Sequence, residues 1–204
     1  MLPSSPAAWD AFWASSPAAV GIDVEGNQQS PPVLVQIATA SLVILEVPAT
    51  AGALSADLIR LLADDSVTKV FCDSTSNDKR CLGIYDADAA PMVAAPVVEL
   101  EHLANARIGG ANVARGFAKI FTLCYTSGRG ARIVKDPTGD PAFFFAMIEQ
   151  GHRPQLSRLD EIPKATKEYA ALDAWATLLA WVHLSHDGPE DEKPAWSQVR
   201  IDGV

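Results

Sequence analysis

The segment AVGIDVEG, residues 19–26, decides the fold and raises the question of function. Its three branched apolar residues occupy alternate positions, which is the period of a β-strand with one face on a core. Asp23 and Glu25 share the other face, because residues two apart on a strand point to the same side. Two like charges beside an apolar core cost free energy unless something positive lies between them. The segment therefore predicts a core strand whose acidic pair needs a cation.

The segments around this strand predict a mixed-sheet α/β domain. Strand patterns at 33–39 and 42–47 form a meander, and the strand at 67–73 follows an amphipathic helix at 55–66, which favours a parallel return. The remaining expected elements are a capped helix at 5–15 whose aromatic residues pack on the core, a short strand leading into a helix or turn at 97–107, and helices at 111–125, 141–151 and 162–186. We expect one domain over residues 1–186 and a polar tail over 187–204.

Composition excludes several classes of protein. The chain has 204 residues, of which 49% are hydrophobic, so it is long enough to bury a sizeable core. No apolar run reaches the roughly 18 residues that would span a bilayer, and the first residues lack the basic start and apolar stretch of a secretory signal. The three cysteines, Cys72, Cys81 and Cys124, have no metal-site spacing. We expect free thiols in an intracellular protein, nuclear or cytoplasmic, without a membrane partner.

The formal net charge of −9 is unevenly distributed. Between Glu101 and Asp136 there is no acidic residue, although the interval contains Arg107, Arg115, Lys119, Arg129, Arg132 and Lys135. Such a basic stretch on an acidic protein is compatible with a polyanion that docks in one place. A solvated face that is basic by chance explains the same pattern.

Two further segments carry acids in informative positions. Asp78 follows the strand at 67–73 and begins a helical segment. Tyr169 and Asp173 lie four residues apart on the long helix and therefore on one face. Small and apolar residues surround Asp173, so its carboxylate is either on the outer face or paired inside, since burying an unpaired carboxylate is costly.

Together these residues resemble the DEDD (DnaQ-like) superfamily of 3′–5′ exonucleases. The shared pattern is D-x-E on a first strand, N-D about fifty residues later and Y-x-x-x-D near the end, and it runs from about residue 18 to 186. The match is to the tyrosine (DEDDy) variant, which includes ribonuclease D and the Werner-type exonuclease domain, because the histidine variant would have histidine where Glu168 stands. The resemblance implies a ribonuclease H-like mixed five-stranded sheet flanked by helices.

The resemblance also implies an activity. It implies hydrolysis of phosphodiester bonds at the 3′ end of single-stranded RNA or DNA, with release of nucleoside 5′-monophosphates. Two Mg²⁺ or Mn²⁺ ions would be held by Asp23, Glu25, Asp78 and Asp173, and such hard cations prefer carboxylate oxygens. Asp23 would bridge both ions. Tyr169 would orient the attacking water, because a phenol with a pKa near 10 is a poor base at neutral pH.

The substrate-binding residues are the less defined part of the site. We expect Asn77, Gln36, Arg115 and Lys119 to contact substrate, although Asn77 is also a natural helix cap and Gln36 a natural partner within the sheet. Residues 135–163 lack the tryptophan usual in ribonuclease D-like relatives, so we expect the details of substrate grip and processivity to differ. The sequence shows no accessory helical nucleic-acid domain, and we expect a protein partner to supply substrate affinity. Two rival functions are a catalytically silent nucleic-acid-binding or scaffold subunit and a phosphohydrolase acting on small nucleotides.

Overall fold

The structure is a computed structural model that describes residues 2–3, 5–26, 32–48, 54–72, 78, 81–82, 93, 95–108, 120 and 162–185. Its strands and helices, in chain order, are β1 (Leu2–Pro3), α1 (Pro6–Ala14), β2 (Ala19–Glu25), β3 (Leu34–Ala38), β4 (Val43–Glu46), α2 (Ala56–Ala63), β5 (Thr68–Phe71), β6 (Val97–Glu99), α4 (Leu100–Ile108) and α7 (Lys164–Ser185). Each lies within a segment that the sequence predicts, apart from β1 and the last residue of α4.

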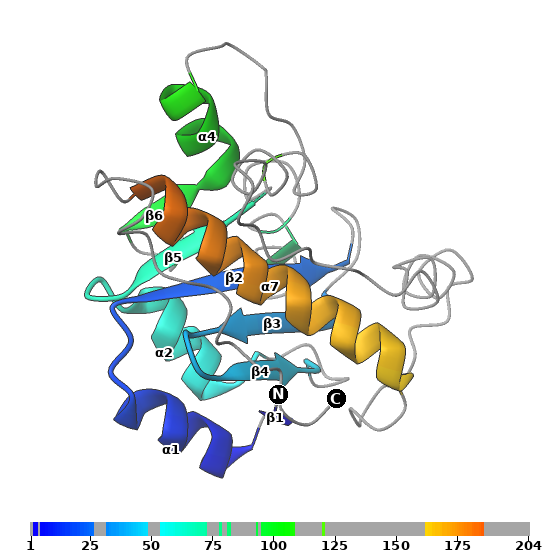
Figure 1. Cartoon of the computed structure of the whole chain (residues 1–204). Helices are drawn as coiled ribbons and strands as arrows, with labels where there is room; N and C mark the ends of the chain where they lie inside the picture. The colour runs from blue at the N-terminus through cyan, green and yellow to red at the C-terminus, as the bar shows by residue number, and fades with distance from the viewer. Residues whose placement is uncertain are drawn as a thin grey trace.

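The strands form one mixed sheet in the order β1-β4-β3-β2-β5-β6 (Figure 1). β2, β3 and β4 form the predicted antiparallel meander, and β5 and β6 run parallel to β2. The predicted ribonuclease H-like sheet of five strands flanked by helices is confirmed. β1 adds a two-residue strand at the edge, parallel to β4.

α1 and α2 cover one face of the sheet, which we call the α2 face. Val20, Ile22 and Val24 from β2 pack there against α1 and α2 in a continuous apolar core. Trp9 and Phe12 are part of that core, as expected for the N-terminal helix. Burial of large apolar side chains is the main source of stability on this face.

α2 is held at its N-terminus by a buried acid. Ser55 caps the helix, because its Oγ accepts a hydrogen bond from the Leu58 amide at 3.1 Å. Glu46, at the end of β4, accepts hydrogen bonds from the Ser55 amide at 3.0 Å and from the Ser55 hydroxyl at 2.7 Å. These bonds fix the N-terminus of the helix to the sheet.

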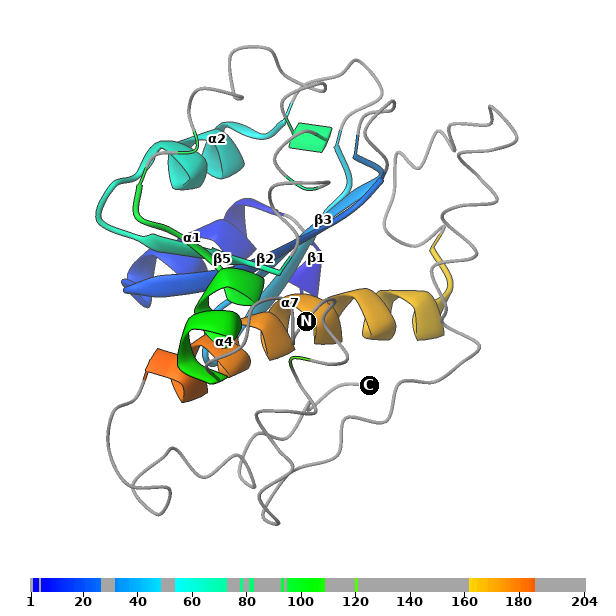
Figure 2. The ribbon, with the colours of Figure 1, turned by 90° about the horizontal axis from the view of Figure 1, so that it is seen from above.

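α7 crosses the opposite face, which we call the α7 face, and Figure 2 shows α2 and α7 on the two sides of the sheet. Ala170 and Ala171 of α7 pack with Leu34 and Leu45 over β3 and β4. Farther along the helix, Ala180 and Leu184 belong to a cluster with residues of β5 and α4. Because the helix places alanines toward the sheet, its backbone approaches the strands closely.

Some predicted segments lie outside the described residues. They are the helices at 111–125 and 141–151, apart from Ile120, and the tail at 187–204. The division into one domain and a tail therefore stays a prediction. Among the described residues, no helix is both long and apolar enough to cross a membrane.

Candidate metal centre

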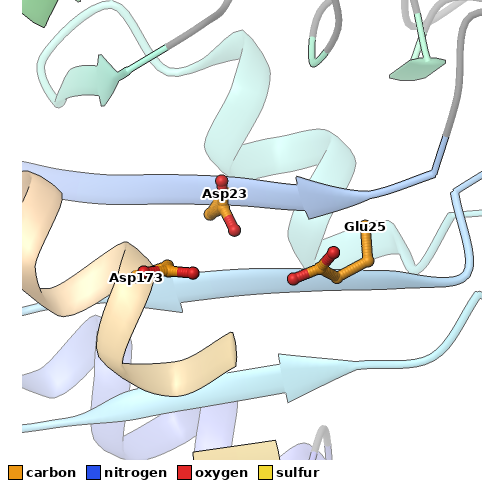
Figure 3. A group of neighbouring side chains, drawn as sticks. All are labelled: Asp23, Glu25 and Asp173. Carbon is orange, nitrogen blue, oxygen red and sulfur yellow. The ribbon is translucent and has the colours of Figure 1, made fainter. Parts of the chain in front are cut away.

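Three carboxylates from two distant segments meet on the α7 face. Asp23 and Glu25 come from β2 and Asp173 comes from α7, and one carboxylate oxygen of each lies within 4.8 Å of the others (Figure 3). Asp23 and Asp173 are half-buried, whereas Glu25 is buried with 9% of its surface exposed. Like charges at this spacing repel, so the arrangement favours a cation among them.

The meeting of these acids depends on Gly21. A Cβ atom at Gly21 would lie 2.1 Å from the backbone oxygen of Ala174 and 2.9 Å from the amide nitrogen of Leu178. Only a residue without a side chain lets α7 lie this close to β2. Since Asp173 precedes Ala174, the close approach also sets the distance between Asp173 and Asp23. This role of Gly21 is not among the predictions from the sequence, although glycine inside a strand pattern is a signal of close backbone approach.

Gln36 of β3 lies beside the acidic group. It pairs directly with Asp23 across the two antiparallel strands. Its Nε2 donates a hydrogen bond of 3.2 Å to Oε1 of Glu25, and its side chain has no exposed surface. Gln36 is expected either to contact substrate or to form a partner within the sheet. Its burial and its hydrogen bond to Glu25 agree with the second alternative, and its contact with substrate stays a prediction.

Asp78 is buried with 3% of its surface exposed and lies outside the group of three mutually close carboxylates. Electrostatics nevertheless connect it with the group. Burial raises the pKa of the Cys72 thiol, and the charges of Glu99, Asp23, Glu101 and Asp78 raise it further. Asp23 and Asp78 thus act on the same sulfur. The coordination of an ion by Asp78 stays a prediction.

The two described cysteines are free, as expected. Burial and the charge of Asp78 raise the pKa of Cys81 to about 12. Neither thiol belongs to the group of mutually close potential metal ligands, which among the described residues consists of carboxylates alone.

Tyr169 lies one helical turn before Asp173 on α7 and is half-buried. This agrees with the expectation that the two share a helix face, while the orientation of a water by its hydroxyl stays a prediction. The neighbouring Glu168 forms an ion pair of 3.4 Å with Lys164. The position at which the histidine variant has its histidine is thus occupied by a carboxylate paired along the helix.

The remaining predicted substrate residues are not placed. Asn77, Arg115 and Lys119 lie outside the described residues, and of the basic stretch only Arg107 is described, on the exposed last turn of α4. Their contact with substrate stays a prediction.

The donor set fits a hard divalent cation. Carboxylate oxygens are the ligands that Mg²⁺ and Mn²⁺ prefer, and Mg²⁺ is usually bound through one or two carboxylates with water and substrate completing the shell. Three carboxylates with mutually close oxygens, on a buried strand and a packed helix, meet that requirement. The site is chemically suited to divalent metal.

No protein-family model and no curated protein sequence matches the chain. Several solved structures do. RNase D of Trypanosoma brucei superposes with a TM-score of 0.61 at 20% identity, over 90% of this chain and 62% of that one. The fold is shared.

Two further structures give the same result. RNase D of Escherichia coli, an exoribonuclease involved in structured RNA processing, has a TM-score of 0.58 at 19% identity over 89% of this chain. NrnC of Brucella melitensis has a TM-score of 0.55 at 19% identity and covers 83% of this chain and 72% of that one. The chain spans 44% of the Escherichia coli protein, and what it shares with RNase D is the fold. The tyrosine subtype stays a prediction.

Proposed function

We propose that this protein is a metal-dependent 3′–5′ exonuclease of the tyrosine type that shortens single-stranded nucleic acid. One observation carries the proposal: carboxylates from β2 and α7, far apart in the sequence, converge within 4.8 Å of one another on a fold shared with RNase D. A stable fold alone gives no reason for this convergence, because the acids repel one another when no cation is bound.

The chemistry follows from the donor set. Asp23, Glu25 and Asp173 would hold divalent metal, with Asp78 completing a second position. When bound, a pair of such ions lowers the pKa of an attacking water and stabilises the charge that develops on the leaving oxygen of the phosphodiester. Tyr169 would orient the water by hydrogen bonding, which requires only a neutral phenol. The packing of α7 on β2 would keep Asp173 and Tyr169 in place during the reaction.

The direct test uses an oligonucleotide labelled at its 5′ end, as RNA and as DNA, with Mg²⁺ or Mn²⁺. We expect a ladder of products that shorten from the 3′ end and release of nucleoside 5′-monophosphates detected by chromatography. A substrate whose last linkages are phosphorothioates should be degraded more slowly. The matched control is Asp173→Asn, which keeps the shape of the residue and removes its charge.

Other outcomes of the same assay would replace the proposal. Binding of the oligonucleotide without cleavage at saturating Mn²⁺ would indicate the silent binding subunit. Hydrolysis of free nucleotides with an intact oligonucleotide would indicate a small-molecule phosphohydrolase. Cleavage that persists in Asp173→Asn would mean that the activity comes from another site or from a contaminant.

A further inference from the structure

Gln36 is a polar side chain in an otherwise apolar strand. Its neighbours along β3 are Val35 and Ile37, both fully buried on the α2 face. Gln36 itself points to the α7 face, since it pairs with Asp23, and it is also fully buried. The side-chain amide of Gln36 is therefore not exposed to solvent.

The hydrogen bonding of Gln36 is one-sided. Nε2 donates to Oε1 of Glu25, whereas Oε1 of Gln36 has no hydrogen-bond partner among the described residues. A buried carbonyl oxygen without a partner costs free energy, and an apolar residue of the same volume would avoid that cost. The fold thus gains little from an amide at this position. Its contact with Glu25 is the feature that an apolar residue would not reproduce.

We infer that Gln36 is a positioning residue, which orients the Glu25 carboxylate toward Asp23 and Asp173 for binding of a divalent cation. The hydrogen bond from Gln36 to Oε1 of Glu25 restrains the rotation of that carboxylate beside Asp23 and Asp173. Because Gln36 is held in the sheet and cannot rotate into solvent, the carboxylate is oriented before the ion arrives. This inference rests on the proposed metal-dependent function.

The test compares two substitutions in the same strand, Gln36→Met and Ile37→Met. Methionine is nearly as long as glutamine but has no amide. At position 37, methionine replaces one apolar residue of the α2 face with another. Partners of a ligating carboxylate typically contribute 10-fold to 100-fold to metal affinity. By isothermal titration with Mn²⁺ alone, we expect Gln36→Met to bind at least about 10-fold more weakly. Ile37→Met should bind like the wild type.

Thermal unfolding without metal separates positioning from stability. The midpoint of Gln36→Met should stay within about 3 °C of the wild type, because the lost hydrogen bond and the removed unpaired oxygen offset each other. Wild-type affinity in Gln36→Met would overturn the inference and leave the proposed function intact. No Mn²⁺ binding by the wild-type protein would instead overturn the proposed metal site itself.

A measurement on the unaltered protein covers the case in which Gln36→Met does not fold. In ¹⁵N-labelled wild type, the side-chain amide signals of Gln36 should shift when Mg²⁺ is added, because coordination withdraws electron density from Glu25. The signal of Gln198, which is distant in sequence from all three acids, serves as the reference. Unshifted Gln36 signals at saturating Mg²⁺ would overturn the inference.

Discussion

Glu46 and Glu25 are both buried glutamates at the ends of strands, but they lie on opposite faces of the sheet. Glu46 accepts two hydrogen bonds from Ser55 and thereby holds the N-terminus of α2. Glu25 accepts one from Gln36 and lies beside the carboxylates of Asp23 and Asp173. A carboxylate bonded to a helix N-terminus stabilises the fold, whereas a carboxylate among other carboxylates destabilises it until a cation binds. The surroundings of the acid, and not its burial, distinguish the two roles.

The largest expected effect is a loss of activity, and it distinguishes Asp23 from its neighbour Ile22 in β2. Asp23→Asn should reduce exonuclease activity by about 1,000-fold, because losing metal coordination removes several kcal/mol of transition-state stabilisation. Its stability should not fall, since one repelling charge is removed. Ile22→Ala, on the α2 face, should instead lose about 2–5 kcal/mol of unfolding free energy. Urea denaturation measures the unfolding free energy, and initial rates on a labelled oligonucleotide measure the activity. An Asp23→Asn enzyme that keeps a tenth of normal activity would contradict the assignment of Asp23 as a metal ligand.

Gly21→Ala should lower both the unfolding free energy and the affinity for Mn²⁺. The added methyl group would overlap the backbone oxygen of Ala174, so α7 must move away from β2 and carry Asp173 with it. We expect a loss of about 1–3 kcal/mol in unfolding free energy together with weaker Mn²⁺ binding. Adding Ala174→Gly should not restore either property, because the overlap is with a backbone atom. Full recovery in the double variant would show that the contact is with the side chain.

A matched pair of glutamine substitutions tests the comparison of the two glutamates directly. Glu46→Gln should lose about 1–3 kcal/mol of unfolding free energy through its bonds to Ser55, while Mn²⁺ affinity is unchanged. Glu25→Gln should weaken Mn²⁺ binding without a loss of stability. Chemical denaturation and calorimetry give the two quantities. The comparison fails if the effects of the two substitutions are reversed or equal.

Tyr169→Phe should slow the reaction without weakening the binding of Mn²⁺. It removes a hydroxyl group and no metal ligand, so Mn²⁺ affinity should be that of the wild type. The rate of the chemical step should fall by up to about 100-fold, the cost of misplacing a reactant. Single-turnover kinetics at saturating metal isolates this step. An unchanged rate would remove Tyr169 from the site.

The sequence predicts the described fold well where a segment carries a strong local pattern. The alternation in β2, the β-branched runs of β3 and β4, and the length of the helical segment of α7 predict elements that the structure confirms. β1 was not predicted, since two residues carry no periodicity.

Within the site, sequence alone indicates the acids but not the contacts that position them. The motif spacing groups Asp23, Glu25 and Asp173, which the structure brings together, while their coordination of metal stays a prediction. The closeness of α7 at Gly21 and the hydrogen bond from Gln36 depend on how a helix crosses a sheet and on strand register. Both are tertiary properties, which local patterns indicate only as an unexpected glycine or a polar residue in an apolar strand.

The most direct test of the central claim is a crystal structure of the protein soaked in Mn²⁺, with anomalous scattering used to locate the metal. We expect Mn²⁺ coordinated by oxygens of Asp23, Glu25 and Asp173. Full occupancy at another place, or no anomalous peak near these three carboxylates at saturating Mn²⁺, would contradict it.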